Sequence, residues 1–302
     1  MSALACPASL KGVLSAADAA AALVEGLGAA VALPVADGGE GTGDVLGGEV
    51  RVARVSDPFG RPVDARWWLR DDGTAVVESA EAIGLARVEE LDPLRSSSAG
   101  LGELIVAALA AGPTSLLVCL GGSATVDGGA GMLSVVRSVP VPLRVACDVR
   151  NPLLGPRGAA RVFGPQKGAG PAHVEELERR LAAIDELAPY RDLPGAGAAG
   201  GLGAALASLG GELLPGAELV LDAIGFDERA RSASLVVTGE GRVDETTFEG
   251  KAPGAVVRRC ERLGVPCVLF SGQAMDYPDV RLLSGDPVRA REDLVALGLS
   301  LR

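Results

Sequence analysis

The chain has 302 residues, of which 48% are hydrophobic and 3% aromatic, and 28 Lys and Arg against 39 Asp and Glu give a formal net charge of −11. This length exceeds one ordinary hydrophobic core, so two domains are expected, with interiors built from Ala, Val and Leu. The acidic surface repels nucleic acid and anionic membranes, which argues against both as partners.

Aliphatic runs alternate with helical patterns in the first and last parts of the chain. Strands are predicted at 3–6, 31–35, 115–120, 143–147, 233–237 and 267–270, and helices at 15–26, 102–111, 174–187 and 253–263. Three alternating segments, 50–55, 63–69 and 74–78, are separated by turns and predict an antiparallel meander. This order predicts a split α/β domain that carries an insert.

The five cysteines are odd in number, form no CxxC pair, and four lie in or beside aliphatic runs. They predict buried free thiols in a reducing cytoplasm. The only histidine, His173, begins a polar helix and is expected to be exposed, which argues against a zinc site or a Ser-His-Asp triad. The first residues lack the pattern of a secretion signal, and no apolar run reaches membrane-spanning length.

Four turns, most of them rich in glycine, follow aliphatic runs and carry an acid or a hydroxyl. They lie at 35–42, 120–129, 145–152 and 237–244. Ligands of α/β sheets bind beyond the carboxyl ends of strands, where glycine lets N–H groups converge on oxygens. Carboxylates there suit Mg²⁺ ligation or proton abstraction. One such turn alone would be a tight turn with a helix cap, but four together predict a shared phosphate and metal site.

Only three of the cations are lysines, and each adjoins a glycine: Lys11, Lys167 and Lys251. A compact ammonium beside a closely approaching backbone suits a phosphate or carboxylate oxygen. Since the chain has 42 glycines, chance adjacency is the alternative explanation. Together with the four turns, the lysines favour an enzyme that handles small anions, phosphates above all.

Two patterns resemble nucleotide motifs and are rejected. Residues 195–200 fit GxGxxG, with Asp222 at a plausible distance, but no strand precedes them, so a flexible loop leading into a helix is expected. Gly250 and Lys251 resemble the end of a P-loop, but Ala252 stands where Ser or Thr is required.

Eight stretches, in order along nearly the whole chain, resemble the type I glycerate kinases. They are 7–12 (PASLKG), 34–42 (PVADGGEGT), 100–105 (GLGELI), 121–132 (GGSATVDGGAGM), 146–153 (ACDVRNPL), 162–169 (VFGPQKGA), 194–203 (PGAGAAGGLG) and 238–244 (TGEGRVD). The resemblance implies an ATP-dependent kinase that uses Mg²⁺ and phosphorylates D-glycerate, at the 2-hydroxyl by family inference alone. It also implies a two-domain α/β fold with the active site in the cleft between the domains.

The expected architecture is a discontinuous Rossmann-like domain with a parallel sheet, residues 1–50 and 231–302. An α/β domain with a mixed sheet, residues 51–230, is inserted into it. The partner is a small hydroxy-acid; the oligomeric state cannot be read from the sequence, and a homodimer is left open.

The matching motifs place the candidate site residues. Asp148 is assigned as the base that accepts the hydroxyl proton, with Asp244 as the second candidate and a turn cap as the alternative for Asp148. Lys11 and Arg242 are assigned to phosphate or carboxylate oxygens, and Asp37 and Glu240 to the metal. The residues assigned to substrate binding are Ser9, Asp37, Glu40 and Arg242. The residues assigned to ATP are Gly121, Gly122, Ser123, Asp127, Gly128, Lys167, Gly200 and Gly201.

Two alternatives stay open at this stage. The chain departs from the family's usual residues at Ala8, Ala99, Val126 and Thr246. A non-catalytic relative that binds a nucleotide or a small hydroxy-acid is the first alternative. A kinase acting on another hydroxy-acid, with a pocket reshaped by Ala99 and Val126, is the second.

Overall fold

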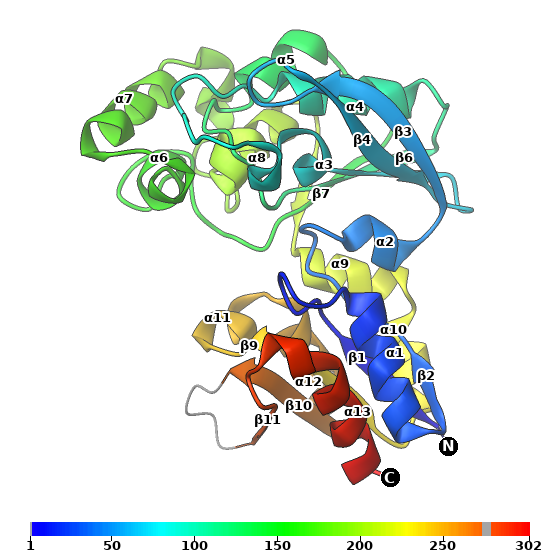
Figure 1. Cartoon of the computed structure of the whole chain (residues 1–302). Helices are drawn as coiled ribbons and strands as arrows, with labels where there is room; N and C mark the ends of the chain where they lie inside the picture. Colours follow the sequence, from blue (N-terminus) through cyan, green and yellow to red (C-terminus); the bar gives the residue numbers. More distant parts are fainter. Residues whose placement is uncertain (1, 274–278) are drawn as a thin grey trace. The chain divides into compact units, whose positions relative to one another are not determined.

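The computed structural model describes residues 2–273 and 279–302 (Figure 1). It divides into two compact units, which are described separately: unit 1 comprises residues 1–37 and 216–302, and unit 2 comprises residues 38–215. Within the described residues, no helix is both long and apolar enough to cross a membrane.

Unit 1 is built on a five-stranded sheet in the order β11-β10-β9-β1-β2, in which every pairing is parallel. The strands are β1 (Ala3–Pro7), β2 (Ala30–Ala32), β9 (Val236–Arg242), β10 (Cys267–Gln273) and β11 (Val280–Leu282). The helices are α1 (Ala16–Leu27), α9 (Gly216–Ala223), α10 (Phe226–Arg231), α11 (Glu245–Glu249), α12 (Ala252–Leu263) and α13 (Ala290–Ser300).

Alternate residues of β1 supply the cores on the two faces of this sheet, as the period of two along a strand requires. Leu4 and Cys6 pack in the same cluster as residues of α9, α10 and α12. Ala3 and Ala5 pack in the cluster formed with α1 and α13, which lie side by side (Figure 1). Unit 1 therefore has helices on both faces of a parallel sheet.

Unit 2 is built on a six-stranded sheet in the order β3-β4-β5-β6-β7-β8. β3, β4 and β5 pair antiparallel, whereas β5 to β8 pair parallel. The strands are β3 (Glu49–Ser56), β4 (Pro62–Leu69), β5 (Thr74–Glu78), β6 (Ser115–Cys119), β7 (Leu143–Ala146) and β8 (Glu212–Leu214). The helices are α2 (Thr42–Leu46), α3 (Ser79–Ile83), α4 (Ala99–Leu109), α5 (Ala130–Val135), α6 (Ala159–Phe163), α7 (Pro171–Ala182) and α8 (Ala198–Ser208).

The predicted α/β class, with one parallel and one mixed sheet, is confirmed, and so is the antiparallel meander. Three element predictions need correction. β2 ends at Ala32 and does not reach Val35. The helix predicted at 174–187 is α7 followed by a 3₁₀ helix, Asp185–Tyr190, because Ile184 between them has extended backbone.

The third correction concerns β9, which continues to Arg242, through residues that the sequence predicted to form a turn. Gly239 permits this because a Cβ there would lie 2.6 Å from the Phe270 ring. The bare backbone lets β9 stay paired with β10 as far as Gln273, which is in register with Arg242.

The unit boundaries lie earlier than 50/51 and 230/231, at 37/38 and 215/216. Residues 38–50 go with unit 2 because the N–H groups of Gly41 and Gly43 donate to Glu78 of β5. Residues 216–230 go with unit 1 because Arg259 of α12 pairs with acids of α9 and α10.

The cysteines are free, as predicted, and all but the half-buried Cys267 are buried. His173 is exposed, also as predicted.

Candidate functional site

The chain leaves β1 and β9, the neighbouring central strands of unit 1, in opposite directions across the sheet. Such a switch point, at the carboxyl ends of parallel strands, is where open α/β sheets bind ligands. Residues after β1 and at the end of β9 line a pocket of about 330 Å³. The predicted site residues that this pocket brings together are Ser9, Lys11, Asp37, Glu240, Arg242 and Asp244.

Glu240 and Asp244, two acids of this pocket, differ in electrostatics. Burial, together with the charge of Asp37, raises the pKa of Glu240, whose Oε1 accepts a hydrogen bond from Thr247 Oγ1 at 2.7 Å. Asp244 caps α11, and a hydrogen bond from Thr246 lowers its pKa. Lys251 Nζ lies between the two, 3.7 Å from Glu240 Oε1 and 3.6 Å from Asp244 Oδ1. Asp244 is therefore poorly suited to accept a proton.

Asp37 and Glu240 fit a magnesium ion. Both are hard oxygen donors, and burial first, with a smaller contribution from the charges of Asp37 and Asp244, raises the pKa of Glu240, an effect that a bound cation would oppose. In the described part of the chain, no group of three or more His, Cys, Asp or Glu converges as a complete metal cage. Two carboxylates suit Mg²⁺, which keeps several waters and takes further oxygens from phosphates.

Sequence reasoning missed several lining residues of the pocket: Lys251, Gln273, Asp286 and Asp293. Lys251 carried a signal, its adjacency to Gly250, which favoured anion binding, but it was not among the residues assigned to the site. Asp293 lies on α13, and no local pattern distinguishes it from the other acids of that helix.

The glycine-rich turn 120–129 follows β6 in unit 2 and rests on a buried lysine. Lys167, which is 2% exposed, donates from Nζ to Ser123 Oγ at 3.0 Å and to the Thr125 carbonyl at 2.7 Å. Burial lowers the pKa of Lys167 to about 7. The structure thus brings together two of the predicted nucleotide residues, Ser123 and Lys167.

Asp127 shapes this turn from within. Its carboxylate accepts hydrogen bonds from the N–H and hydroxyl of Ser98, both at 2.8 Å, and from the N–H groups of Gly129 and Gly131, both at 3.1 Å. These bonds tie the turn to the starts of α4 and α5, and they leave the carboxylate committed to the fold.

The glycines of the turn are required by close backbone contacts. Gly128 N–H donates to the Gly200 carbonyl at 3.0 Å, and a Cβ on Gly200 would lie 2.1 Å from the Thr125 carbonyl. A Cβ on Gly201 would lie 2.7 Å from Gly128 Cα. The predicted glycines of residues 194–203 and 120–129 thus form one packed pair of turns.

Gly121 and Gly122 lie close to the segment that contains Glu40. A Cβ on Gly121 would lie 2.7 Å from Gly39 Cα, and one on Gly122 would lie 3.9 Å from Glu40 Oε2. Glu40 is exposed, and Gly122 is exposed beside it. Three more predicted residues therefore share one surface of unit 2.

Glu78 is a buried acid that sequence reasoning missed, although it directly follows the apolar residues 75–77 of β5. It is 1% exposed and accepts the N–H groups of Gly41 at 3.0 Å and Gly43 at 2.6 Å. Burial raises the pKa of Glu78 to about 7. Glu78 is in register with Cys119 of β6, and Cys119 with Ala146 of β7. The half-buried Asp148 follows β7, so Glu78, the glycine-rich turn and Asp148 lie at the carboxyl ends of adjacent parallel strands, at one edge of the sheet.

Glu78 gives a testable dependence of stability on pH. Its folded pKa of about 7 lies above the ordinary value of 4.5. Between these values the folded state keeps a proton that the unfolded state has lost, so stability falls as pH rises through this window. The free energy of unfolding of the wild type should fall by about 2–3 kcal/mol between pH 4.5 and pH 8, and Glu78→Gln should abolish this fall. Urea unfolding of both proteins at pH 4.5, 6 and 8 measures it. An unchanged pH slope in the variant would contradict this assignment.

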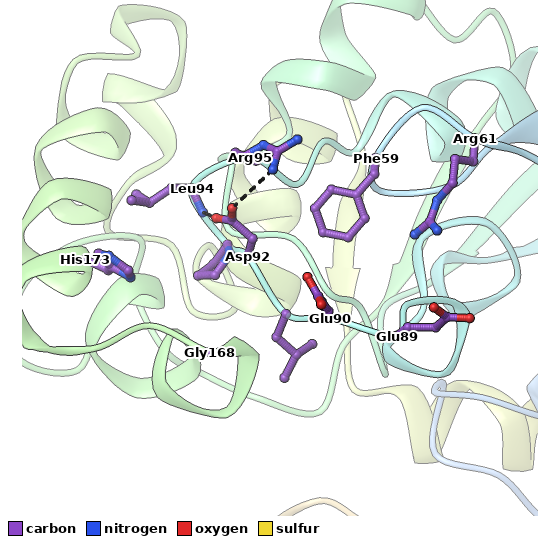
Figure 2. A pocket seen from close by; sticks show the side chains of 11 residues that line it. Phe59, Arg61, Glu89, Glu90, Asp92, Leu94, Arg95, Gly168 and His173 are labelled. Atoms are coloured by element: carbon purple, nitrogen blue, oxygen red, sulfur yellow. Dashed lines mark hydrogen bonds and ion pairs between the residues drawn. The ribbon is translucent and has the colours of Figure 1, made fainter.

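A second hollow, of about 740 Å³, lies on unit 2 (Figure 2). Glu89, Glu90 and Asp92 line it, and Arg95 lies 3.9 Å from Asp92 within it (Figure 2). Of the residues predicted to form the site, none belongs to the described lining of this hollow.

Comparison with known proteins gives a consistent result. The model of the glycerate kinase family matches residues 3–139 and 135–281. The chain is 39% identical to glycerate 2-kinase of Escherichia coli K12 over 322 aligned residues, 89% of this chain and 84% of that protein. It is 40% identical to glycerate kinase of Bacillus subtilis 168, over 88% and 83% of the two chains. The crystal structure of a putative glycerate kinase 2 from Salmonella typhimurium LT2 matches with a TM-score of 0.87 at 34% identity, covering 100% of this chain and 97% of that one.

The chain belongs to the glycerate kinase family. It is accordingly a phosphotransferase with an alcohol group as acceptor, acting on a small molecule and a nucleotide. In this glycerate kinase family member, the match includes the residues that line the pocket of unit 1 from Ser9 to Gln273. It also includes the whole glycine-rich turn of unit 2.

Proposed function

We propose that the chain transfers the γ-phosphoryl group of ATP to the 2-hydroxyl of D-glycerate. The observation that carries this proposal is the pocket at the switch point of unit 1, which is lined by Lys11 and Arg242 together with Asp37 and Glu240. Cations for anionic oxygens beside carboxylates for a metal are what phosphoryl transfer requires. The names of the relatives, glycerate kinase and glycerate 2-kinase, support the choice of acceptor and position.

Lys11 and Arg242 have the charge to neutralise phosphate or carboxylate oxygens. Lys11 is exposed beside Gly12, whose φ of +73° marks a tight turn, so its ammonium is accessible to a ligand. Ser9 lies in the same pocket and adds a hydroxyl that can donate to the same oxygens. These groups act mainly by positioning and by electrostatic stabilisation, which dominate this type of reaction.

Asp37 and Glu240 would hold the magnesium ion. When bound, this ion neutralises charge on the phosphate oxygens. The two side chains contribute the carboxylate oxygens, and Thr247 fixes Glu240 through its hydrogen bond to Oε1.

In unit 2, the backbone of Gly121 and Gly122 and the hydroxyl of Ser123 would bind phosphate oxygens. Asp148 is the proposed base for the acceptor hydroxyl, because it lies just beyond the end of β7, at the edge of the sheet where these groups lie. Asp244 is the weaker candidate, since its hydrogen bond from Thr246 lowers its pKa. The free thiols support a reducing compartment, and we place the enzyme in the cytoplasm.

The proposal is tested by measuring ADP formation from Mg-ATP with and without D-glycerate, and by identifying the product by NMR. We expect glycerate-dependent turnover of about 1–100 s⁻¹ and phosphorylation at the 2-position. Nucleotide binding without turnover, for glycerate and for a panel of small hydroxy-acids, would favour the non-catalytic alternative instead.

Lys11→Met tests the pocket of unit 1. Removing the ammonium deletes a charge-assisted contact, so kcat/KM should fall about 10- to 100-fold. Arg54→Met is the control, because it also removes one cation but from an exposed ion pair with Asp64. Equal rates for Lys11→Met and the wild type would remove Lys11 from the site.

A further inference from the structure

Lys167 is a buried cation that has no carboxylate partner among the described residues. Its ammonium donates to two neutral oxygens, Ser123 Oγ and the Thr125 carbonyl. Buried charges in proteins are normally paired, because removing an ion from water is costly. Among the described residues, Lys167 therefore lacks the directly paired counter-charge that a buried ion normally has.

Asp127 does not supply that counter-charge directly. Its negative charge acts on Lys167 and raises the pKa, against the larger effect of burial. Its carboxylate oxygens, however, are taken by Ser98, Gly129 and Gly131. The ammonium is thus held close to an acid without being neutralised by it.

The direction of the hydrogen bonds defines the role of Ser123. When Lys167 is charged, its ammonium has donors only, so Ser123 Oγ accepts from it. The hydroxyl hydrogen of Ser123 is left to donate elsewhere, and within the described residues no acceptor takes it. Thr125, in the same turn, has a fully buried hydroxyl that also lacks a partner in the described structure. The turn therefore holds two hydroxyls without an acceptor in the described structure, and one of them, that of Ser123, is bonded to an ammonium without a carboxylate partner.

We propose that Lys167 is a positioning residue that fixes Ser123 as a hydrogen-bond donor to an oxygen of the anionic substrate. The bound anion then supplies the counter-charge that the buried ammonium lacks. This inference rests on the proposed function, because it takes the anion to be a nucleotide phosphate or the glycerate carboxylate. It changes the role of Lys167 from direct contact with ATP to action through Ser123.

Proton uptake on binding is the expected consequence. Burial lowers the pKa of Lys167 to about 7, so the side chain is mostly neutral at pH 8 and mostly charged at pH 6. An anion near Ser123 favours the charged form, and Lys167 should therefore take up a proton when the anion binds at pH 8. At pH 6 the proton is already present, and the uptake should be small.

Isothermal titration calorimetry in buffers of different ionisation enthalpy measures this uptake. D-glycerate, ADP and inorganic phosphate are titrated separately at pH 6 and pH 8, into wild type and Lys167→Met. We expect uptake approaching about one proton at pH 8, larger than at pH 6, and absent from Lys167→Met. Protons exchanged by the ligands or by Glu78 contribute equally to wild type and variant, so they cancel in the difference between the two. The ligand that shows the difference identifies the source of the anion.

Arg161→Met serves as the control, since it removes an exposed cation of α6 that pairs with Glu175. It should keep the uptake of the wild type. The same uptake in Lys167→Met as in wild type would overturn the proposal, and so would no uptake with any of the three anions.

A double-mutant cycle tests whether Lys167 acts through Ser123. Lys167→Met and Ser123→Ala should each weaken binding of the identified anion about 10- to 100-fold, and the double variant should be no weaker than the worse single variant by more than about threefold. Fully additive losses would mean that the two residues act independently, which contradicts the proposal. If Lys167→Met does not fold, Ser123→Ala alone must reduce the proton uptake, and unchanged uptake would overturn the proposal.

These outcomes are separable from the proposed function. Glycerate-dependent ADP formation without Lys167-linked uptake would leave the kinase intact and remove this inference. Lys167-linked proton uptake with phosphate, in a chain that makes no ADP, would support the role of Lys167 and contradict the kinase activity.

Discussion

Asp148→Asn is expected to lower kcat roughly a hundred- to ten-thousandfold, because the acceptor hydroxyl loses the group that takes its proton. Asp148 follows β7, whose neighbour β6 leads into the glycine-rich turn, so it lies at the edge that collects the proposed nucleotide residues. Asparagine keeps the size of the side chain but cannot act as a base. Nucleotide affinity should therefore stay within about threefold of the wild type, since the lost group acts on the proton.

Asp192→Asn is the matched control, since Asp192 is an exposed acid of unit 2 outside the turns described above. Initial rates and ADP binding should be measured for both variants. A kcat of wild-type size in Asp148→Asn would remove it as the base and leave it the role of a turn cap.

Gly200→Ala is expected to destabilise the protein by about 3–5 kcal/mol, from a left-handed backbone and a severe contact together. Gly200 has φ of +76°, and a Cβ there would meet the Thr125 carbonyl at 2.1 Å. Gly210→Ala is the control, because Gly210 has a similar φ of +87° but nothing within 4 Å of its added Cβ. The control should lose only about 1 kcal/mol.

Urea unfolding of both variants separates the two contributions. The difference between them measures how tightly residues 194–203 pack on the glycine-rich turn. Equal losses of stability in the two variants would show that the contact between the turns is not constrained as the structure indicates.

The sequence predicted the class of fold well because hydrophobic periodicity reports local burial directly. The meander stands out since its strands alternate, and the parallel strands stand out as short aliphatic runs such as Ser115–Cys119. The end of β9 could not be predicted in the same way. Gly239 and Gly241 read as a turn locally, and only the partner strand β10 keeps that segment extended.

The site could be predicted in part for a similar reason. Glycine turns after aliphatic runs marked Lys11, Asp37 and Glu240, which the structure brings into one pocket. Asp293 and Glu78 escaped because their roles depend on which strand or helix neighbours them in space. Asp127 stands in a glycine-rich turn and was therefore assigned to the nucleotide. Its hydrogen bonds to Ser98, which is distant in sequence, show that its carboxylate holds the turn in place instead.

A crystal structure with a non-hydrolysable ATP analogue, Mg²⁺ and D-glycerate tests the site most directly. The predicted result is a metal ion coordinated at about 2.0–2.1 Å by carboxylate oxygens of Asp37 or Glu240, with Lys11 on an anionic oxygen of a ligand. A metal and ligands held elsewhere, with Lys11, Asp37 and Glu240 touching neither, would contradict the proposed site.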